Sequence, residues 1–381
     1  MRPAAPGGMN DHFDVAIVGA GIAGAGIAFH LAPHARVLLL EAEAAPGSHS
    51  TGRSAALYAP AYGPPAVREL TRASRGFFDA PPAGFAAVPL LAPRGVLFVA
   101  PPERREQAAA LAATLRAEGG AVDLLDGARA RDVVPVLRPE ACVAAVASPD
   151  AQDIDVDALL QGFVRGARAA GAVLACDARV DTLAREGGGW RIGCADGRGF
   201  RAAVVVDAGG AWADAVAALA GARPLGVEPR RRSAFVFEPP AGMAIAHWPA
   251  VIDIDEGWYL KPEAGLLLGS PANADPTHAH DVVAEEYDIA LGIHRIEQAT
   301  TLSIRRPRRT WAGLRSFVAD GEPVLGFDPA VPGLFWAAAL GGYGIQCSPA
   351  FTALAAELLR GAAPDAAAGV RARLDAGRAL R

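Results

Sequence analysis

Three glycines and one acid near the N-terminus are spaced for binding a dinucleotide. Gly19, Gly21 and Gly24 form a GxGxxG pattern directly after an apolar run at residues 15–18. Such glycines permit a tight turn, close approach of the backbone to a pyrophosphate, and packing of a helix against a strand. Glu41 follows about 20 residues beyond the middle glycine, where an acid hydrogen-bonds ribose hydroxyls. Because an acid there disfavours a 2′-phosphate, the residues indicate FAD or NAD rather than NADP.

The elements that position these groups form a strand-helix-strand unit. Residues 15–18 are predicted as a buried strand, a helix follows to about Leu31, and residues 37–40 form a second strand. Phosphates would lie at the helix N-terminus, where free N–H groups and the helix dipole favour negative charge. A glycine-rich turn without a ligand is the alternative.

The polar loop at residues 46–54 suggests a ligand longer than NAD. Ser50, Thr51 and Arg53 can hydrogen-bond a diphosphate or a ribityl chain, and Ala55 and Ala56 leave room for a flat ring. These features favour FAD. An ordinary solvated loop is the alternative.

Two further glycine turns precede predicted helices. Gly209 and Gly210 follow a short strand at residues 204–206, and LGGYGIQ, at residues 340–346, precedes apolar residues with helical spacing. Ser348 and Pro349 suit the N-cap and first position of that helix, and Gly361 suits its end.

Composition limits the class of protein. The 381 residues allow two domains, and the net charge of 36 − 41 = −5 leaves no overall electrostatic footprint for nucleic acid. The four cysteines have no CxxC spacing, which argues against a zinc site or a disulfide framework. The first twelve residues show no secretory signal and no apolar run is long enough for a membrane span, so a soluble, cytoplasmic protein is expected.

Several stretches together resemble the D-amino-acid oxidase superfamily of flavoproteins. They are VAIVGAGIAG with Glu41, then HSTGRSAA, DAGGAW, WAGLRSF and LGGYGIQ. HSTGRSAA and LGGYGIQ are specific motifs, whereas GxGxxG alone is not. Within the superfamily, the chain is most similar to the bacterial FAD-dependent D-arginine dehydrogenases, along nearly its full length.

The resemblance implies an α/β fold with two interleaved domains. A Rossmann-type FAD-binding domain would comprise residues 13–95, 148–224 and 312–361. A mainly antiparallel substrate-binding domain would comprise residues 96–147 and 225–311, and residues 362–381 would form a loose tail.

The resemblance also assigns FAD contacts to residues of these motifs. They are Gly19, Gly21, Gly24, Glu41, Ser50, Thr51, Arg53, Ser54, Ala55, Val180, Gly209, Gly210, Trp212, Gly341, Gly344, Ile345 and Gln346. The helix start at LGGYGIQ would face the flavin pyrimidine, where its N–H groups stabilise the negative charge of the reduced ring. No cysteine lies near Arg315, where some sarcosine oxidases of the superfamily attach flavin, so non-covalent FAD is expected.

Arg315 lies in an apolar sequence, GLRSF, where a guanidinium needs an anionic partner. By resemblance this arginine holds a substrate α-carboxylate. The other residues assigned to that site are Arg232, Tyr62, Tyr259, Gly342 and Gln346. For Arg232, a solvated strand end is the alternative.

The implied reaction is oxidative deamination of a D-amino acid. Hydride passes from Cα to flavin N5, and the imino acid hydrolyses to a 2-oxo acid and ammonia. The electrons then pass to an acceptor such as oxygen or a quinone, and no metal or protein nucleophile is required. The alternatives are a sarcosine/glycine-type amine oxidase, a flavin-binding protein without turnover, or an NAD-binding module.

The predicted pocket departs from the D-arginine dehydrogenases at three positions. Val96, Leu57 and Ala59 are apolar where that family carries a glutamate, a histidine and a threonine. A preference for apolar D-amino acids is therefore expected. Asp253 or Glu256, in the loop before Tyr259, are acids that would counter this expectation.

Two other features have competing interpretations. Residues 277–281, THAHD, suggest a polar loop more than a metal site. Lys261 shares a strand face with Tyr259, and it either approaches the flavin or extends to the surface.

Overall fold

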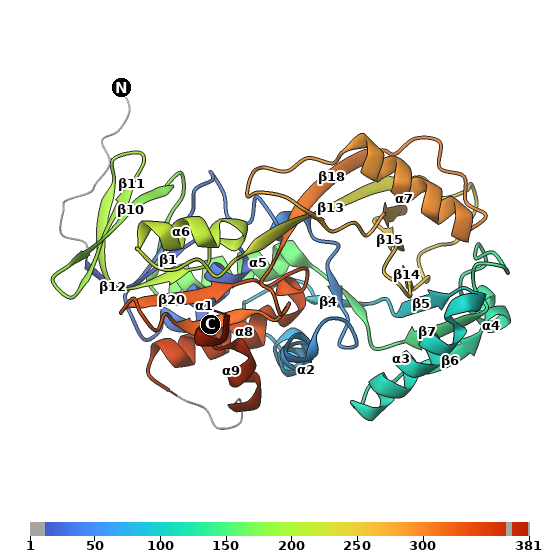
Figure 1. The fold of residues 1–381 in the computed structure, drawn as a ribbon, viewed down its shortest axis with the longest axis horizontal. Coiled ribbons are helices and arrows are strands. Elements are labelled where there is room, and N and C mark those ends of the chain that lie inside the picture. The colour runs from blue at the N-terminus through green and yellow to red at the C-terminus, as the bar shows by residue number, and fades with distance from the viewer. Residues whose placement is uncertain (1–11, 363–367, 380–381) are drawn as a thin grey trace.

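The computed structural model describes residues 12–362 and 368–379 and contains two large sheets. Figure 1 shows the first sheet at the left and the second at the right. The first eleven residues, which include most of the segment inspected for a secretory signal, lie outside the described part of the chain.

The first sheet contains eight strands and has a parallel centre. Its central strands follow the order β12-β1-β2-β9, and β20 extends the parallel part beyond β12. The strands are β1 (His12–Val18), β2 (Val37–Leu40), β9 (Val173–Ala175), β10 (Val180–Glu186), β11 (Gly189–Cys194), β12 (Gly199–Asp207), β19 (Val324–Phe327) and β20 (Leu334–Ala338). The parallel strands bring their carboxyl ends to one edge, which is where open α/β sheets bind nucleotides.

Helices cover both faces of this sheet. On one side α1 packs against α5 and α8, and α2 packs against α8, while α6 packs against β10 and β12. Their bounds are α1 (Ile22–Leu31), α2 (Pro65–Asp79), α5 (Val156–Ala169), α6 (Ala213–Leu219) and α8 (Gly344–Leu359). The predicted strand-helix-strand unit is confirmed by β1, α1 and β2.

The second sheet contains nine strands and is mainly antiparallel. Its order is β17-β13-β16-β15-β14-β5-β7-β6, with β18 also paired to β13, and β14-β5 is its parallel pair. The strands are β5 (Val96–Ala100), β6 (Asp123–Asp126), β7 (Ala144–Ser148), β13 (Glu228–Phe237), β14 (Ala250–Asp253), β15 (Tyr259–Glu263), β16 (Leu266–Ser270), β17 (Asp275–Pro276) and β18 (Arg309–Phe317). Helices α3 (Arg105–Ala117), α4 (Gly127–Val133) and α7 (Glu286–Ala299) pack against it.

Short elements join the two sheets. The small sheet β3-β8-β4 consists of β3 (Leu57–Tyr58), β4 (Leu91–Pro93) and β8 (Gln152–Ile154). Single-turn helices lie at Thr51–Arg53, Pro102–Arg104 and Gly210–Trp212. Strand β18 pairs with β13 along its whole length, so the domain boundary expected at residue 312 falls inside a strand of the second sheet.

Helix α8 begins earlier than the sequence suggests. Ser348 and Pro349 were expected at its start, but the helix begins at Gly344 and Pro349 lies inside it. Proline cannot donate to the carbonyl four residues earlier, that of Ile345. The Ser348 hydroxyl donates to this carbonyl instead (3.0 Å), which compensates the missing bond. The predicted end is confirmed, because Gly361 adopts a positive φ of 78° just after the helix.

The expected loose tail is wrong for the residues that the structure describes. Residues 368–379 form α9 (Ala368–Leu374) and α10 (Ala376–Ala379). Val370, Leu374 and Ala376 are buried, the first two against α1, α2 and α8 residues of the first sheet's core. Residues 363–367, 380 and 381 of the expected tail lie outside the description.

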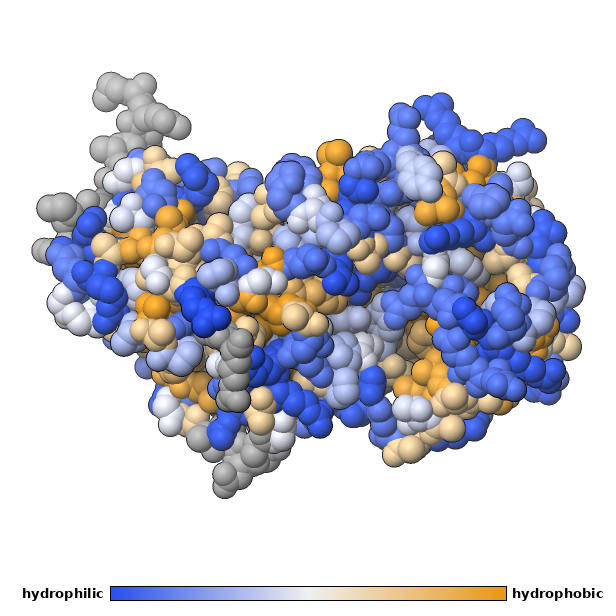
Figure 2. Space-filling view, viewed as in Figure 1, coloured by the Kyte–Doolittle hydropathy of each residue, from blue (hydrophilic) through white to orange (hydrophobic). Residues whose placement is uncertain are grey.

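The visible surface is mixed in polarity. On the face in Figure 2, apolar residues form scattered patches between polar and charged ones. Across residues 12–362 and 368–379, no helix combines the length and apolar character needed to span a membrane.

A cluster of aromatic rings surrounds His30 at the end of α1. His30 lies 6.1 Å from Phe77 and 6.2 Å from Phe163, measured between ring centroids, and Phe29 is 5.0 Å away. Its Nε2 atom is buried without a hydrogen-bond partner. Burial therefore lowers the pKa of His30 from 6.5 to about 4.

This histidine makes stability fall at acid pH. Between pH 6.5 and about 4 the unfolded chain binds a proton at His30 and the folded chain does not, so the free energy of unfolding decreases as pH falls. The pKa difference corresponds to about 3 kcal/mol.

Replacing His30→Phe keeps a ring in the cluster and should remove the loss of stability that His30 causes at acid pH. The measurement is the unfolding midpoint as a function of pH. The control, His34→Phe at an exposed position, should retain the dependence of the original protein, and an unchanged His30→Phe profile would refute the assignment.

Candidate functional site

One cavity of about 790 Å³ extends from the carboxyl edge of the first sheet to the second sheet. Residues from β1, β2, β10 and β20 line one part, and residues from β13, β14, β15 and β18 line another. The cavity brings together all but three of the expected site residues, and the exceptions are Gly24, Ala59 and Val96.

The glycine turn after β1 shapes the dinucleotide end. Gly19 has φ +102°, and a Cβ there would lie 2.5 Å from the Ala208 carbonyl oxygen. At Gly24 a Cβ would lie 1.9 Å from the Gly19 oxygen, so Gly24 serves helix-strand packing behind the cavity. At Gly21 a Cβ would lie 3.4 Å from the Thr51 hydroxyl oxygen, and Gly21 itself lines the cavity. This cradle fits a pyrophosphate.

Glu41 and Thr51 complete this end. The Glu41 carboxylate, 8% exposed, accepts hydrogen bonds from the backbone N–H groups of Ala20 (2.9 Å) and Glu43 (3.0 Å). The Thr51 hydroxyl accepts from the N–H of Ile22 at the start of α1 (3.0 Å). A carboxylate has lone pairs beyond these two bonds, so Glu41 can also accept from ribose hydroxyls. These residues fit the AMP half of FAD.

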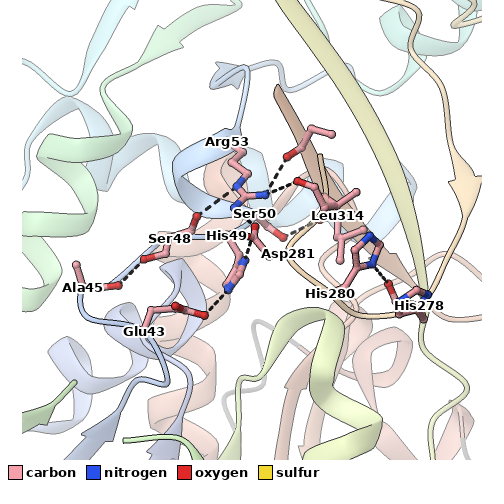
Figure 3. Close-up of polar contacts among 12 residues, drawn as sticks. Glu43, Ala45, Ser48, His49, Ser50, Arg53, His278, His280, Asp281 and Leu314 are labelled. Atoms are coloured by element: carbon pink, nitrogen blue, oxygen red, sulfur yellow. Dashed lines mark hydrogen bonds and ion pairs between the residues drawn. The ribbon is translucent and has the colours of Figure 1, made fainter. Parts of the chain in front are cut away.

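The loop expected to bind the second half of the cofactor forms hydrogen bonds with β18 and with the segment before α7 (Figure 3). The Ser50 hydroxyl donates to the Leu314 carbonyl of β18 (2.7 Å). Arg53 donates to the carbonyls of Val282 (2.8 Å) and Ala312 (3.2 Å). Both side chains line the cavity, but their polar groups already have protein partners.

The far end of the cavity holds two arginines on neighbouring strands. In the register of β13 and β18, Arg232 lies opposite Gly313, two residues before Arg315. Within the described residues neither guanidinium forms an ion pair with a carboxylate, and Arg232 donates to the Asn273 carbonyl (2.6 Å). Burial and the nearby charge of Arg315 lower the pKa of Arg232. An anion bound between the two would relieve this repulsion.

Arg315 is fixed by close packing. Its guanidinium carbon lies 5.2 Å from the ring centroid of Phe317 and 5.3 Å from that of Tyr343. A Cβ at Gly342 would lie 2.0 Å from Arg315 Nε, so glycine is required there for the guanidinium to occupy this place. Burial works against its charge, but Tyr62, Tyr343 and Glu256 outweigh burial and raise the pKa of Arg315.

Tyr62 is held over the arginines from two sides. Its hydroxyl donates to Glu256 (2.8 Å), and its backbone carbonyl accepts from the Gln346 amide (3.2 Å). The Gln346 oxygen also accepts from the N–H of Ala59 (2.9 Å). The buried Gln346 side chain therefore fixes the turn between Ala59 and Tyr62. Burial raises the pKa of the Tyr62 hydroxyl, which keeps it protonated as a hydrogen-bond donor.

Two expected pocket residues do not reach the cavity. Val96 and Ala59 are buried in a cluster with residues of α3. Val96 lies on β5, and β14 separates it from the cavity, which Ala250 and Ile252 of β14 line instead. Leu57, the third apolar residue expected in the pocket, does line the cavity.

Glu256 and Lys261 are cavity residues whose roles the sequence left open. Glu256 reaches the cavity from a turn with φ +54°, whereas Asp253 accepts the Gly257 N–H (2.9 Å) and does not line it. Lys261 is 4% exposed and pairs with Asp153 and Glu263, each at 2.8 Å. The surface interpretation of Lys261 is therefore wrong. The sequence signal for Glu256 was an acid just before the strand that contains Tyr259.

The histidines of residues 277–281 stack on one another. The rings of His278 and His280 are 4.4 Å apart, and His280 Nδ1 lies 2.8 Å from the His278 carbonyl oxygen. Among the residues that the structure describes, no three His, Cys, Asp or Glu side chains are grouped to hold a metal ion.

A family model matches most of the chain. The DAO model, described as FAD dependent oxidoreductase, matches residues 14–358. This range includes both sheets, apart from the first two residues of β1, and every residue discussed at the cavity.

Individual relatives support the same class. Glycine oxidase of Geobacillus kaustophilus (strain HTA426) is 28% identical over 373 residues, covering 92% of this chain and 94% of that protein. Its crystal structure has a TM-score of 0.82 at 26% identity, covering 93% of this chain and 96% of the other. FAD-dependent oxidoreductase domain-containing protein 1 of Xenopus laevis is 31% identical over 177 residues, 41% of this chain, and the match spans 34% of that relative's length. Iminodiacetate oxidase from Chelativorans sp. BNC1 shares the fold, with a TM-score of 0.79 at 24% identity over 92% and 96% of the two chains.

The contact between Gly342 and Arg315 predicts a selective defect. Gly342→Ala should displace the guanidinium and weaken binding of a small carboxylate by roughly tenfold or more, since a charge-assisted bond contributes about 1.5–3 kcal/mol. FAD affinity should change little. Both quantities are measured by titration of flavin absorbance. Gly76→Ala, at a helix position with open space around it, is the matched control, and equal carboxylate affinity in both variants would contradict this role of Gly342.

Proposed function

Because the chain belongs to the DAO family of FAD-dependent oxidoreductases, we propose that it deaminates D-amino acids oxidatively to 2-oxo acids and ammonia. The observation that carries the proposal is the pair of arginines in the same cavity as the dinucleotide cradle. Two guanidinium groups that form no ion pair within the described part of the chain are suited to the α-carboxylate of an amino acid.

The proposed roles follow from the contacts of each side chain. Arg315, held by Gly342 and two aromatic rings, binds the carboxylate, and Arg232 adds a second positive charge. Tyr62 and Tyr259 line the same space and close it above the substrate. Fixing the carboxylate orients Cα, and such positioning is the main catalytic contribution that this protein makes.

FAD, when bound, would supply the acceptor for the hydride of Cα and would pass the two electrons to a further acceptor. The unprotonated substrate amine would become the imine, and water would then add to the imino carbon as ammonia leaves. Gly21, Glu41 and the residues of the LGGYGIQ turn would hold the cofactor without a covalent link.

The cavity wall supports apolar substrate side chains. Leu57, Ala250 and Ile252 line it next to Tyr259. Glu256 is exposed and already accepts a hydrogen bond from Tyr62, so it is a poor partner for a buried substrate cation. A D-arginine dehydrogenase-like enzyme with preference shifted toward D-leucine, D-methionine or D-phenylalanine fits this wall.

A sarcosine/glycine-type amine oxidase is the second candidate. It is favoured by the similarity to glycine oxidase over nearly the full length of both chains. The two candidates share the carboxylate arginine and differ in what the apolar wall contacts.

A substrate panel separates these proposals. Anaerobic addition of D-leucine, D-methionine or D-phenylalanine to the FAD-loaded protein should bleach the flavin, and kcat/KM with an artificial acceptor should exceed that for D-arginine by roughly tenfold. The expected ratio reflects a missing charge-assisted bond of about 1.5–3 kcal/mol. Glycine or sarcosine as the best substrate would favour the second candidate. D-Arginine leading D-leucine tenfold would refute the apolar preference, and no bleaching by any amine would refute both enzymes.

Removal of the carboxylate arginine tests the shared part of the mechanism. Arg315→Met should retain FAD and lower kcat/KM roughly ten- to a hundredfold or more, because the lost contact contributes about 1.5–3 kcal/mol. Arg230→Met is the matched control, because Arg230 lies opposite Arg315 in the strand register but pairs with Glu228 (2.5 Å). Similar activity in the two variants would contradict the assignment.

A further inference from the structure

Most of the hydrogen-bond donors of Arg53, in the cofactor loop, already have protein partners. Its Nη1 donates to the carbonyls of Val282 and Ala312, its Nε donates to the Ser48 carbonyl (3.3 Å), and its Nη2 donates to Asp281. A guanidinium has five N–H donors, and these four bonds leave about one for any ligand. A bidentate grip on a phosphate is therefore not available to this side chain.

The partners of Arg53 belong to a different part of the fold. Ala312 lies on β18, and Asp281 and Val282 lie between β17 and α7, all in or beside the second sheet. The Trp311 indole also donates to the Arg53 carbonyl (3.2 Å), and a Cβ at Gly313 would lie 3.3 Å from Arg53 Cβ. Both the backbone and the side chain of Arg53 are thus fixed by the second sheet.

Asp281 makes a second contact with the same loop. It lies 3.9 Å from Nδ1 of His49, whose Nε2 is 2.9 Å from Glu43 and whose ring packs on Trp212 at 4.7 Å. Figure 3 shows Asp281 between His49 and Arg53, facing the loop. His49, Arg53 and Trp212 all line the cavity.

We propose that Asp281 and Arg53 form a clasp that retains FAD by positioning the cofactor loop, and not by a bidentate contact between Arg53 and a phosphate. Arg53 is thus a positioning residue, in contrast to the ligand contact expected from the sequence. Asp281 is 73% exposed in its side chain, so the clasp is open to solvent and can release when the loop moves. In this proposal, the loop at residues 47–56 must separate from residues 281 and 282 before FAD can enter or leave the cavity.

The clasp and a direct phosphate contact predict opposite effects at Asp281. In the clasp, Asp281→Asn removes a charged partner and loosens the loop, so FAD should dissociate about threefold to tenfold faster, as for an exposed ion pair supported by hydrogen bonds. With a direct contact, the same change would free the guanidinium for the phosphate, and FAD would bind equally or more tightly.

The experiment measures FAD dissociation from the loaded protein by recovery of flavin fluorescence. The variants are Asp281→Asn, Arg53→Met and their combination, with Asp275→Asn as the matched control, since Asp275 is exposed and pairs with Arg231 at 3.7 Å. The clasp predicts faster release from both single variants, a double variant no faster than Arg53→Met, and an unchanged control. Asp281→Glu should restore slow release.

Unchanged or slower release from Asp281→Asn would overturn the proposal. Additive effects in the double variant would also overturn it, because two residues acting through one contact are not additive. The readout does not depend on turnover, so the result stands apart from the identity of the substrate.

Discussion

Two positive charges held side by side at the end of one cavity are the constraint that organises this structure. Arg232 and Arg315 come from paired strands and repel one another, and burial disfavours both charges. Aromatic rings, a glycine and a hydrogen-bonded tyrosine keep Arg315 in place, and among the described residues no carboxylate forms an ion pair with it. A site built this way has its electrostatic complement in a bound carboxylate.

Strand β18 links that charge to the cofactor end of the cavity. The carbonyls of Ala312 and Leu314 accept hydrogen bonds from Arg53 and Ser50, while the neighbouring side chain, Arg315, faces the cavity. One strand thus positions both the loop beside the dinucleotide cradle and the Arg315 guanidinium. In the proposed function, the position of the substrate relative to the cofactor therefore depends on β18. Placing both contacts on one strand favours precise positioning.

Local patterns in the sequence predicted the parts of this site that depend on spacing along the chain. The GxGxxG turn, the acid after β2 and the arginine in an apolar strand are examples, because each is defined by its immediate neighbours. Val96 could not be placed, because the strand order puts β14 between β5 and the cavity. The partners of Arg53 beside the second sheet could not be predicted either, since they lie more than two hundred positions away along the chain. The start of α8 was missed because a serine hydroxyl compensates for the internal proline.

The proposed reaction requires the cavity to hold the flavin and the substrate carboxylate together. The most direct measurement is a crystal structure of the FAD-loaded protein with a bound 2-oxo acid. We predict the pyrophosphate at the Gly19–Gly21 turn, the flavin ring beside residues 341–346, and the carboxylate within hydrogen-bonding distance of the Arg315 guanidinium. A carboxylate bound away from Arg315, or a flavin ring outside this cavity, would contradict the account.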